Sequence, residues 1–186
     1  MRNRPSDRRA GADNHAPRSR SVLIICAANT ARSIIAEHLL RRELGTRGAD
    51  GSIVIRSAGI APYARDGALV SLDTRMTLRS VGIDLGEEAT STDLKRHPEM
   101  LTAADVVIAM TEQQARDLVE RFDGSASRPI FTLRSFAGEA GDIADPFEQG
   151  HEVFDRCREE IMRLIPMVAD RLLTDELLAE VERAED

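Results

Sequence analysis

Short apolar runs rich in β-branched residues alternate along this chain with longer stretches of helical periodicity. The first run, Val22-Leu23-Ile24-Ile25, is typical of a central parallel strand that is covered on both faces. From Ser33 the apolar positions follow one face of a helix, which is expected to end at Gly45. Because the same change of period recurs, the sequence predicts a three-layer α/β fold. In such a fold a doubly wound parallel sheet has right-handed crossovers and is flanked by helices.

Three further strands and three further helices continue this alternation. The strands are expected at residues 53–55, 105–110 and 130–133. The helices are expected at residues 68–81, at residues 111–122 and, as a long amphipathic helix that closes the domain, along residues 154–172. The helix at 111–122 is expected to bury Ala115, Leu118, Val119 and Phe122. Pro166 lies inside the closing helix and is expected to kink or divide it.

The two ends of the chain differ in composition from its middle. Of the 186 residues 42% are hydrophobic, which is enough for one domain with a substantial core. Residues 1–20 are rich in charge and contain no large apolar side chain after Met1, so they are predicted to be a disordered basic arm. An anion-binding arm and a docking tail are the alternatives. The folded domain is expected at residues 21–173, followed by an acidic extension at residues 174–186.

The charge and composition of the chain argue against several classes of binding partner and cofactor. The net charge is −7, and because the arm contributes +4 the rest of the chain carries −11, which argues against nucleic-acid binding. No apolar run approaches the roughly 18 residues of a membrane helix, and the N-terminus lacks the apolar segment of a secretory signal. Two cysteines cannot form a disulfide framework, so a reducing cytoplasm is expected. The four histidines lack metal-ligand spacing and no nucleotide fingerprint is present, so neither a metal nor a cofactor is expected.

The loop after the first strand joins a cysteine to an arginine and the start of a helix. Ligands of parallel sheets bind at the carboxyl ends of the strands, where Cys26-Ala27-Ala28-Asn29-Thr30-Ala31-Arg32-Ser33 lies. The N–H groups of such a loop and the helix dipole favour an anion such as phosphate, which the guanidinium of Arg32 can also bind. The same field stabilises a Cys26 thiolate as a nucleophile. Ser33 can donate to that thiolate, and Asn29 can fix the loop conformation.

The spacing of a cysteine and an arginine six residues apart is weak evidence by itself, because Cys157 and Arg163 share it. Cys157 lies on the apolar stripe of the closing helix, where residues six apart point away from each other. We therefore expect Cys157 to be a small buried hydrophobic residue. For Cys26 an inert buried thiol is the alternative, and the strand–loop–helix context favours the nucleophile.

Asp145-Pro146-Phe147 follows the last strand and precedes the closing helix, at the same edge of the sheet as Cys26. An Asp-Pro pair is most often only a turn. At this place, however, Asp145 can protonate a leaving group and then, as a carboxylate, activate water against a phosphocysteine. Pro146 stiffens the loop, and Phe147 can pack against an aromatic substrate ring.

These features together resemble the low-molecular-weight protein tyrosine phosphatase family, including its bacterial members. The likeness covers roughly residues 21–170, and its strongest stretches are 22–33, 56–59, 82–85, 104–110 and 145–147. The resemblance implies a four-stranded parallel sheet in the order 2-1-3-4. It also implies that residues 21–173 form a catalytic domain.

The resemblance assigns roles to particular residues. The nucleophile falls on Cys26, the phosphate-binding arginine on Arg32 and the general acid on Asp145. Positions that support the loop fall on Asn29, Ser33 and Ser57. Substrate-binding residues are expected to be Ala27, Ala28, Asn29, Thr30, Ala31, Ser33, Ser57, Tyr63 and Phe147.

Three departures from the family pattern bear on activity. Ala28 stands where the family usually has glycine, which costs on the order of 1 kcal/mol if that residue needs a positive φ. Ala31 stands where many members carry a second cysteine, so a disulfide beside Cys26 cannot form. Glu87-Glu88 replace a segment with His and Arg, and near the rim of the site they would repel anionic substrates.

Three functions are compatible with these residues. The first is a metal-free phosphomonoesterase that acts on phosphotyrosine in proteins. The second is an arsenate reductase on the same fold, which requires a resolving cysteine that Cys157 is poorly placed to supply. The third is a weakly catalytic phosphate-binding module, suggested by Ala28 and Glu87-Glu88. The substrate, whether phosphotyrosine, phosphoarginine or a small phosphoester, and the oligomeric state stay open at this point.

Overall fold

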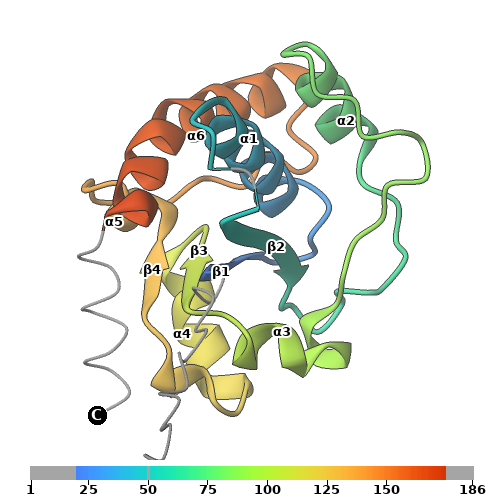
Figure 1. Cartoon of the computed structure of the whole chain (residues 1–186). Coiled ribbons are helices and arrows are strands. Elements are labelled where there is room, and N and C mark those ends of the chain that lie inside the picture. The colour runs from blue at the N-terminus through green and yellow to red at the C-terminus, as the bar shows by residue number, and fades with distance from the viewer. Residues whose placement is uncertain (1–19, 50, 175–186) are drawn as a thin grey trace, which may run out of the picture.

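A computed structural model of the chain describes residues 20–49 and 51–174. Its centre is a four-stranded sheet in which all neighbouring strands run parallel, in the order β2-β1-β3-β4 (Figure 1). This architecture confirms the predicted fold class and strand order. The strands are β1 (Arg20–Cys26), β2 (Ile53–Gly59), β3 (Val106–Ala109) and β4 (Ile130–Thr132).

Helices cover both faces of the sheet. One face carries α1 (Arg32–Thr46), α2 (Leu72–Arg79), α5 (Leu133–Phe136) and α6 (His151–Leu173). The other face carries η1 (Leu94–Arg96), α3 (Pro98–Thr102) and α4 (Glu112–Arg121), and η2 (Ser125–Ser127) follows α4. Figure 1 shows α1 and α6 above the sheet and α3 and α4 below it. Each face therefore has its own apolar core, with the sheet between the two cores.

The burial of the strands follows from their places in the sheet. β1 lies between β2 and β3, so its apolar run from Val22 to Ile25 is buried on both faces. β2 is an edge strand, and buried Ile53 and Ile55 alternate along it with exposed Val54 and Arg56. The chain thus places its most continuous apolar run at the centre of the sheet, directly before Cys26.

The bounds of several predicted elements differ in the structure, and for two of them the hydrogen bonds show why. The helix expected at residues 68–81 begins only at Leu72, because residues 68–70 pair with residues 89–91 and Ser71 then caps α2. The strand expected to reach Leu133 ends one residue earlier. There, Thr132 and Ser135 form a capping box that starts the short helix α5, which was not predicted.

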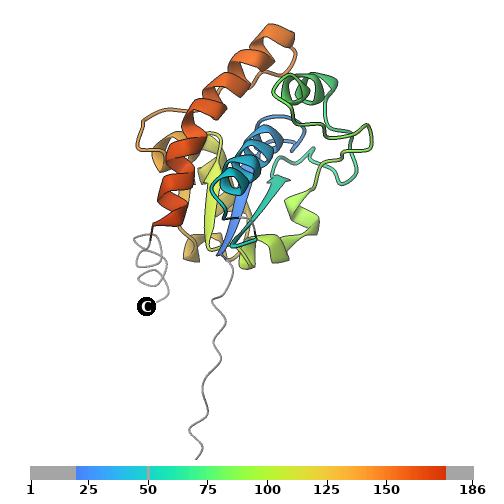
Figure 2. The same cartoon turned by 45° about the horizontal axis from the view of Figure 1, so that its top comes forward.

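One prediction about helix packing is wrong, and of the two outcomes expected for Pro166 the kink is observed. Val119, expected to be buried, is 49% exposed, because it lies at the margin of the apolar face of α4. Pro166 does not divide the closing helix, since α6 runs unbroken from His151 to Leu173. Figure 2 shows that the axis of α6 bends along its length.

The predicted arm and acidic extension lie outside the described residues, apart from Arg20 and Thr174. Arg20 is the first residue of β1. Its guanidinium donates hydrogen bonds to the backbone carbonyls of Leu172 and Thr174, at the end of α6. The start of β1 is thereby joined to the end of the last helix.

The carboxyl edge of the sheet brings the first two strands to an end side by side. Cys26, the last residue of β1, is paired in register with Gly59, the last residue of β2. A Cβ atom on Gly59 would lie 2.8 Å from the backbone carbon of Ala28 and 2.9 Å from the carbonyl oxygen of Ala27. Glycine at this position therefore lets the loop after Cys26 pack closely over the end of β2.

Candidate active site

The loop between β1 and α1 surrounds the thiol of Cys26, which is only 3% exposed. The Cys26 Sγ accepts a hydrogen bond from the backbone N–H of Asn29 at 3.2 Å and lies 3.0 Å from the Oγ of Ser33. The N-cap residue of α1 is Ala31, and no side chain caps this helix within the described part of the chain. The N–H groups of its first turn are therefore available to an anion such as phosphate.

Asn29 holds this loop from the inside. Its φ of 59° lies in the left-handed region, which asparagine tolerates better than most residues. The Asn29 Nδ2 donates to the Oγ of Ser33 at 2.9 Å and to the Oγ of Ser57 at 2.8 Å. Its Oδ1 accepts from the backbone N–H of Thr92 at 2.8 Å. One buried side chain thus ties the loop to α1, to β2 and to the segment before η1.

Three of the predicted substrate-binding residues, Asn29, Ser33 and Ser57, lie away from the surface of the pocket. All three are buried, and none of them lines the pocket above Cys26. Their polar atoms are engaged with one another and with the Cys26 sulfur. The geometry fits the supporting role that the resemblance implied for them.

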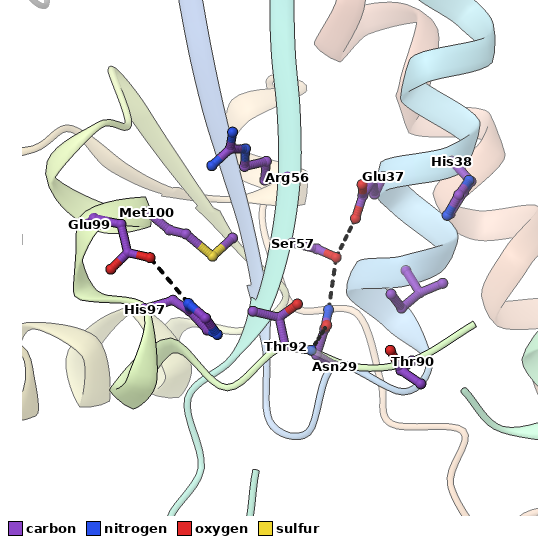
Figure 3. A pocket seen from close by; sticks show the side chains of 11 residues that line it. Asn29, Glu37, His38, Arg56, Ser57, Thr90, Thr92, His97, Glu99 and Met100 are labelled. Atoms are coloured by element: carbon purple, nitrogen blue, oxygen red, sulfur yellow. Dashed lines mark hydrogen bonds and ion pairs between the residues drawn. The ribbon is translucent and has the colours of Figure 1, made fainter. Parts of the chain in front are cut away.

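A second cavity, of about 410 Å³, lies on the other side of Asn29, at the edge strand β2 (Figure 3). We call it the back cavity. It is lined by Asn29, Ile34, Glu37, His38, Arg56, Ser57, Thr90, Thr92, His97, Glu99 and Met100. In Figure 3, Ser57 lies between Asn29 and Glu37.

Glu37 extends the network of Asn29 into the back cavity. The Ser57 hydroxyl donates to the Glu37 carboxylate, which also pairs with Arg41 at 2.7 Å. A chain of hydrogen bonds therefore runs from Glu37 through Ser57 to Asn29. Asn29 belongs to the loop at residues 26–33, which carries Cys26 and which we call the catalytic loop. Sequence reasoning missed Glu37, although its place one helical turn after Ser33 puts both on one face of α1.

The pKa values of two histidines in the back cavity are shifted in opposite directions. Burial lowers the pKa of His38 below its usual value. Hydrogen bonds to the carboxylates of Glu99, at 3.1 Å, and Asp66, at 3.0 Å, raise the pKa of His97. The back cavity therefore combines an imidazole that favours the neutral form with one that favours the charged form.

Asp145 lies at the catalytic loop and is paired with Arg32. The Arg32 Nη2 donates to the Asp145 carboxylate, and its Nη1 donates to the carbonyl of Ile143 at 3.0 Å. The Arg32 side chain is buried, whereas that of Asp145 is 49% exposed. The backbone N–H of Phe147 donates to the Asp145 Oδ1 at 3.2 Å, which holds the turn around Pro146. The structure thus brings Cys26, Arg32 and Asp145 to one pocket.

This catalytic pocket has a volume of about 320 Å³. Its lining includes six of the predicted substrate-binding residues, namely Ala27, Ala28, Thr30, Ala31, Tyr63 and Phe147. Tyr63 and Phe147 are 66% and 61% exposed. The pocket therefore has small side chains around the thiol and two aromatic side chains that a ligand can contact.

Two of the departures from the family pattern, Ala28 and Glu87-Glu88, disturb the pocket less than expected. Positive φ angles outside glycine occur, among the described residues, at Asn29 and Glu148, so Ala28 is not in that region. The expected cost of alanine at this position is therefore absent. Glu87 and Glu88 are exposed and do not line the catalytic pocket, so the expected repulsion acts only from outside it.

Cys157 lies in the core, as expected, next to residues 143–147, the loop around Asp145 that we call the acid loop. It is 5% exposed, and its Sγ is 4.0 Å from the carbonyl oxygen of Ala144. Burial raises the pKa of the Cys157 thiol to about 12. A thiol of this kind stays protonated near neutral pH, which is unfavourable for the resolving role that an arsenate reductase needs.

The described residues offer neither a metal site nor a membrane-spanning helix. Residues 20–49 and 51–174 contain no group of three or more His, Cys, Asp or Glu side chains arranged to hold a metal ion. No helix in the same ranges is both long and apolar enough to span a membrane.

Known proteins similar to this chain are phosphatases. A protein-arginine-phosphatase of Geobacillus stearothermophilus is 35% identical over 156 residues, which is 83% of this chain and 97% of the relative. A low molecular weight protein tyrosine phosphatase from T. tengcongensis has a solved structure with a TM-score of 0.72 and 31% identity. The match covers 82% of this chain and 99% of that one.

A third solved structure shows a cysteine-to-serine mutant of the YwlE arginine phosphatase with a phosphorylated active-site serine. It matches with a TM-score of 0.75 and 27% identity, over 84% of this chain and 99% of that one. The family described as low molecular weight phosphotyrosine protein phosphatase matches residues 21–180. With the sheet order, the catalytic loop and the acid loop in place, this chain belongs to that family.

Proposed function

We propose that this protein is a protein phosphatase that works through a phosphocysteine intermediate on Cys26. The Cys26 Sγ attacks phosphorus and forms an S–P bond while the bond from phosphorus to the leaving atom breaks. The loop N–H groups and the Arg32 guanidinium bind the phosphoryl oxygens, where negative charge gathers in the transition state. The Ser33 hydroxyl, 3.0 Å from Sγ, can donate to the thiolate and support it as nucleophile and leaving group.

Asp145 supplies the proton transfers in both steps. As a carboxylic acid it protonates the leaving nitrogen or oxygen. As a carboxylate it then takes a proton from the water that attacks the phosphocysteine, and the S–P bond breaks to release phosphate. Its exposed side chain at the pocket, next to Arg32, supports both roles.

For the substrate we propose protein phosphoarginine, and the ion pair between Arg32 and Asp145 is the observation that carries this choice. In the structure the Asp145 carboxylate already binds a guanidinium, that of Arg32. When Arg32 turns to bind phosphate, one oxygen of Asp145 can accept an N–H group from the guanidinium of a substrate, and the other oxygen, when protonated, can donate to the leaving nitrogen.

Thr30 and the aromatic residues of the pocket support the same choice. Within residues 20–49 and 51–174 no protein group makes a hydrogen bond with the Thr30 hydroxyl, so this hydroxyl can serve as a second acceptor in the pocket. The planar faces of Tyr63 and Phe147 can stack on a guanidinium. The arginine phosphatases among the similar proteins are consistent with this substrate.

Protein phosphotyrosine is the second candidate. Tyr63 and Phe147 fit an aryl ring as well as a guanidinium, and a tyrosine phosphatase is among the similar structures. Phosphotyrosine needs no hydrogen-bond acceptor along its side chain before the bridging oxygen. The two substrates therefore differ in their use of Asp145 before the chemical step.

The test compares two peptides of identical sequence that carry phosphoarginine or phosphotyrosine at one position. Phosphate release is measured near pH 7.5 with a chelator present, for the wild type and for Cys26→Ser. We expect kcat/KM to be at least about tenfold higher for phosphoarginine, since one well-placed charged hydrogen bond contributes about 1.5–3 kcal/mol. The reverse ranking would establish the tyrosine phosphatase, and turnover by Cys26→Ser would overturn the mechanism.

A further inference from the structure

The four most exposed large apolar side chains among the described residues are Tyr63, Leu69, Leu72 and Phe147, each more than 60% exposed. Tyr63 and Phe147 line the catalytic pocket, but Leu69 and Leu72 do not. We propose that Leu69 and Leu72 form a docking surface for an apolar side chain of the protein substrate, beside the pocket that takes its phosphorylated residue. We call these two residues the apolar rim. This inference rests on the proposed function, in that the substrate is a protein.

Backbone contacts fasten the apolar rim to the catalytic loop. The N–H of Ser71 and the hydroxyl of Thr74 both donate to the carbonyl oxygen of Thr30, at 3.2 and 3.0 Å. Thr30 itself lines the pocket. Leu72 is the neighbour of Ser71 in the chain, so their Cα atoms are only about 3.8 Å apart. The apolar rim therefore begins within one residue of a direct contact with the catalytic loop.

Local structure holds both leucines away from the core. Residues 68–70 pair with residues 89–91, and since successive side chains of an extended segment alternate, buried Val70 leaves Leu69 on the outer side. In α2 the buried residues are Thr74, Thr77 and Leu78, and Leu72 lies on the opposite side of the helix. The fold therefore does not use these two side chains.

A further contact fixes the apolar rim relative to the acid loop. Asp73, the residue after Leu72, lies 3.2 Å from the Nδ1 of His151, at the first turn of α6. Figure 1 shows α2 beside the start of α6, which follows the acid loop in the chain. Because the rim is held at both Thr30 and His151, a substrate would meet a preformed surface with little ordering cost.

The size of the pocket indicates what covers the apolar rim. A volume of about 320 Å³ suits one phosphorylated side chain, so the rest of a protein substrate must lie across the mouth. An extended chain advances roughly 3.3 Å per residue. An apolar side chain two to four residues from the phosphorylated one therefore lies about 7–13 Å from it, and these flanking positions are the ones that we expect the rim to contact.

The test uses matched phosphopeptides with Leu or Ser at those flanking positions, a small aryl phosphate, and the double variant Leu69→Ser/Leu72→Ser. Val119→Ser on α4 serves as control, because Val119 is 49% exposed on the far face of the sheet. Thermal unfolding checks that each variant is folded. For the wild type we expect kcat/KM to be about tenfold higher on the Leu peptide than on the Ser peptide.

The double variant should lose this preference and keep the wild-type rate on the aryl phosphate within twofold, while Val119→Ser should retain the preference. Equal rates of the wild type on both peptides would overturn the apolar rim and leave the proposed function intact. An equal loss of activity on the aryl phosphate would also overturn it, because the rim would then act on the pocket itself. If the wild type hydrolyses the aryl phosphate but neither peptide, the proposed function fails, and the rim fails with it.

Discussion

The catalytic pocket and the back cavity lie on two sides of one loop, and they use their polar groups in different ways. In the catalytic pocket, Asp145 and the Thr30 hydroxyl are accessible to a ligand. At the wall of the back cavity, Asn29, Ser57 and Glu37 bond to one another. The pocket therefore carries groups that a ligand can reach, as the proposed function requires, whereas the back cavity carries groups that hold the loop in shape. Substitutions in the pocket should lower the rate of a folded enzyme, and those in the back cavity should affect rate and stability together.

The largest loss is expected for Asp145→Asn. Asparagine keeps the size of the side chain but cannot donate the proton that the leaving atom needs, so kcat should fall by about 10²–10⁴-fold. Stability should change by less than about 1 kcal/mol, because the paired carboxylate is half exposed. Steady-state kinetics and thermal unfolding measure both quantities, with Glu152→Gln at an exposed position of α6 as control. A small loss of kcat would contradict the role of Asp145 as the acid.

Asn29→Ala should break the support of the loop. Three hydrogen bonds are lost, and alanine at a φ of 59° adds strain, so unfolding should become easier by about 3–4 kcal/mol. Because Sγ loses its fixed surroundings, kcat should also fall by at least about tenfold. Urea unfolding and kinetics provide the measurements.

Asn29→Gly is the matched control for this change. Glycine adopts a φ of 59° without strain, but like alanine it lacks the three hydrogen bonds of the asparagine amide. Full stability in Asn29→Gly would mean that backbone strain, and not the network, explains the effect of alanine.

The difference between the catalytic pocket and the back cavity also shows which parts of the site could be predicted from the sequence. Cys26 ends the first strand and Asp145 lies between the last strand and the closing helix, so the topology of a parallel sheet places both at one edge. Glu37 has no such marker, because a glutamate on a helix is usually solvated. Its role depends on Ser57, 20 residues away, and on the pairing of β1 with β2 that sets the position of Ser57.

The two elements with misplaced bounds have different causes, one local and one not. Leu133 is buried whether it ends a strand or begins α5, so its hydrophobicity could not distinguish the two. The capping box of Thr132 and Ser135 decides the outcome through hydrogen bonds. Leu69 and Val70 fit a helix by spacing, but their pairing with residues 89–91 depends on a segment that is distant in sequence.

A smaller effect is expected for Glu37→Ala, which removes the acceptor of the Ser57 hydroxyl. Ser57 remains bonded to Asn29, so the loop should loosen without collapsing. We expect kcat on an aryl phosphate to fall by about three- to tenfold with little change in KM, equivalent to about 1 kcal/mol.

Glu43→Ala tests whether this effect belongs to the back cavity. Glu43 pairs with Arg47 at 2.8 Å, as Glu37 pairs with Arg41 at 2.7 Å, and both pairs are spaced four residues apart on α1. Glu43 has no contact with the network and should leave kcat unchanged. An equal loss in both variants would show that helix stability alone accounts for the loss.

The smallest expected effect concerns the two histidines, which report on the back cavity without changing the rate. In an NMR titration between pH 5 and 8, His97 should have its midpoint above the usual 6.5 and His38 below it. At pH 6.5 most His97 should therefore be charged and most His38 neutral. Because a raised pKa favours the charged form in the folded state, the contacts of His97 should strengthen at low pH and fade as pH rises through that midpoint.

Glu99→Gln separates the two causes of these shifts. Removing the carboxylate should move the His97 midpoint toward lower pH, because its hydrogen bond to Glu99 makes the largest contribution. The His38 midpoint should stay in place, since its burial and the nearby charges of Glu37 and Arg41 determine it and Glu99 does not. If both midpoints move together, the back cavity behaves as one coupled unit. The separation between groups that hold the loop and groups that only line the cavity would then no longer hold.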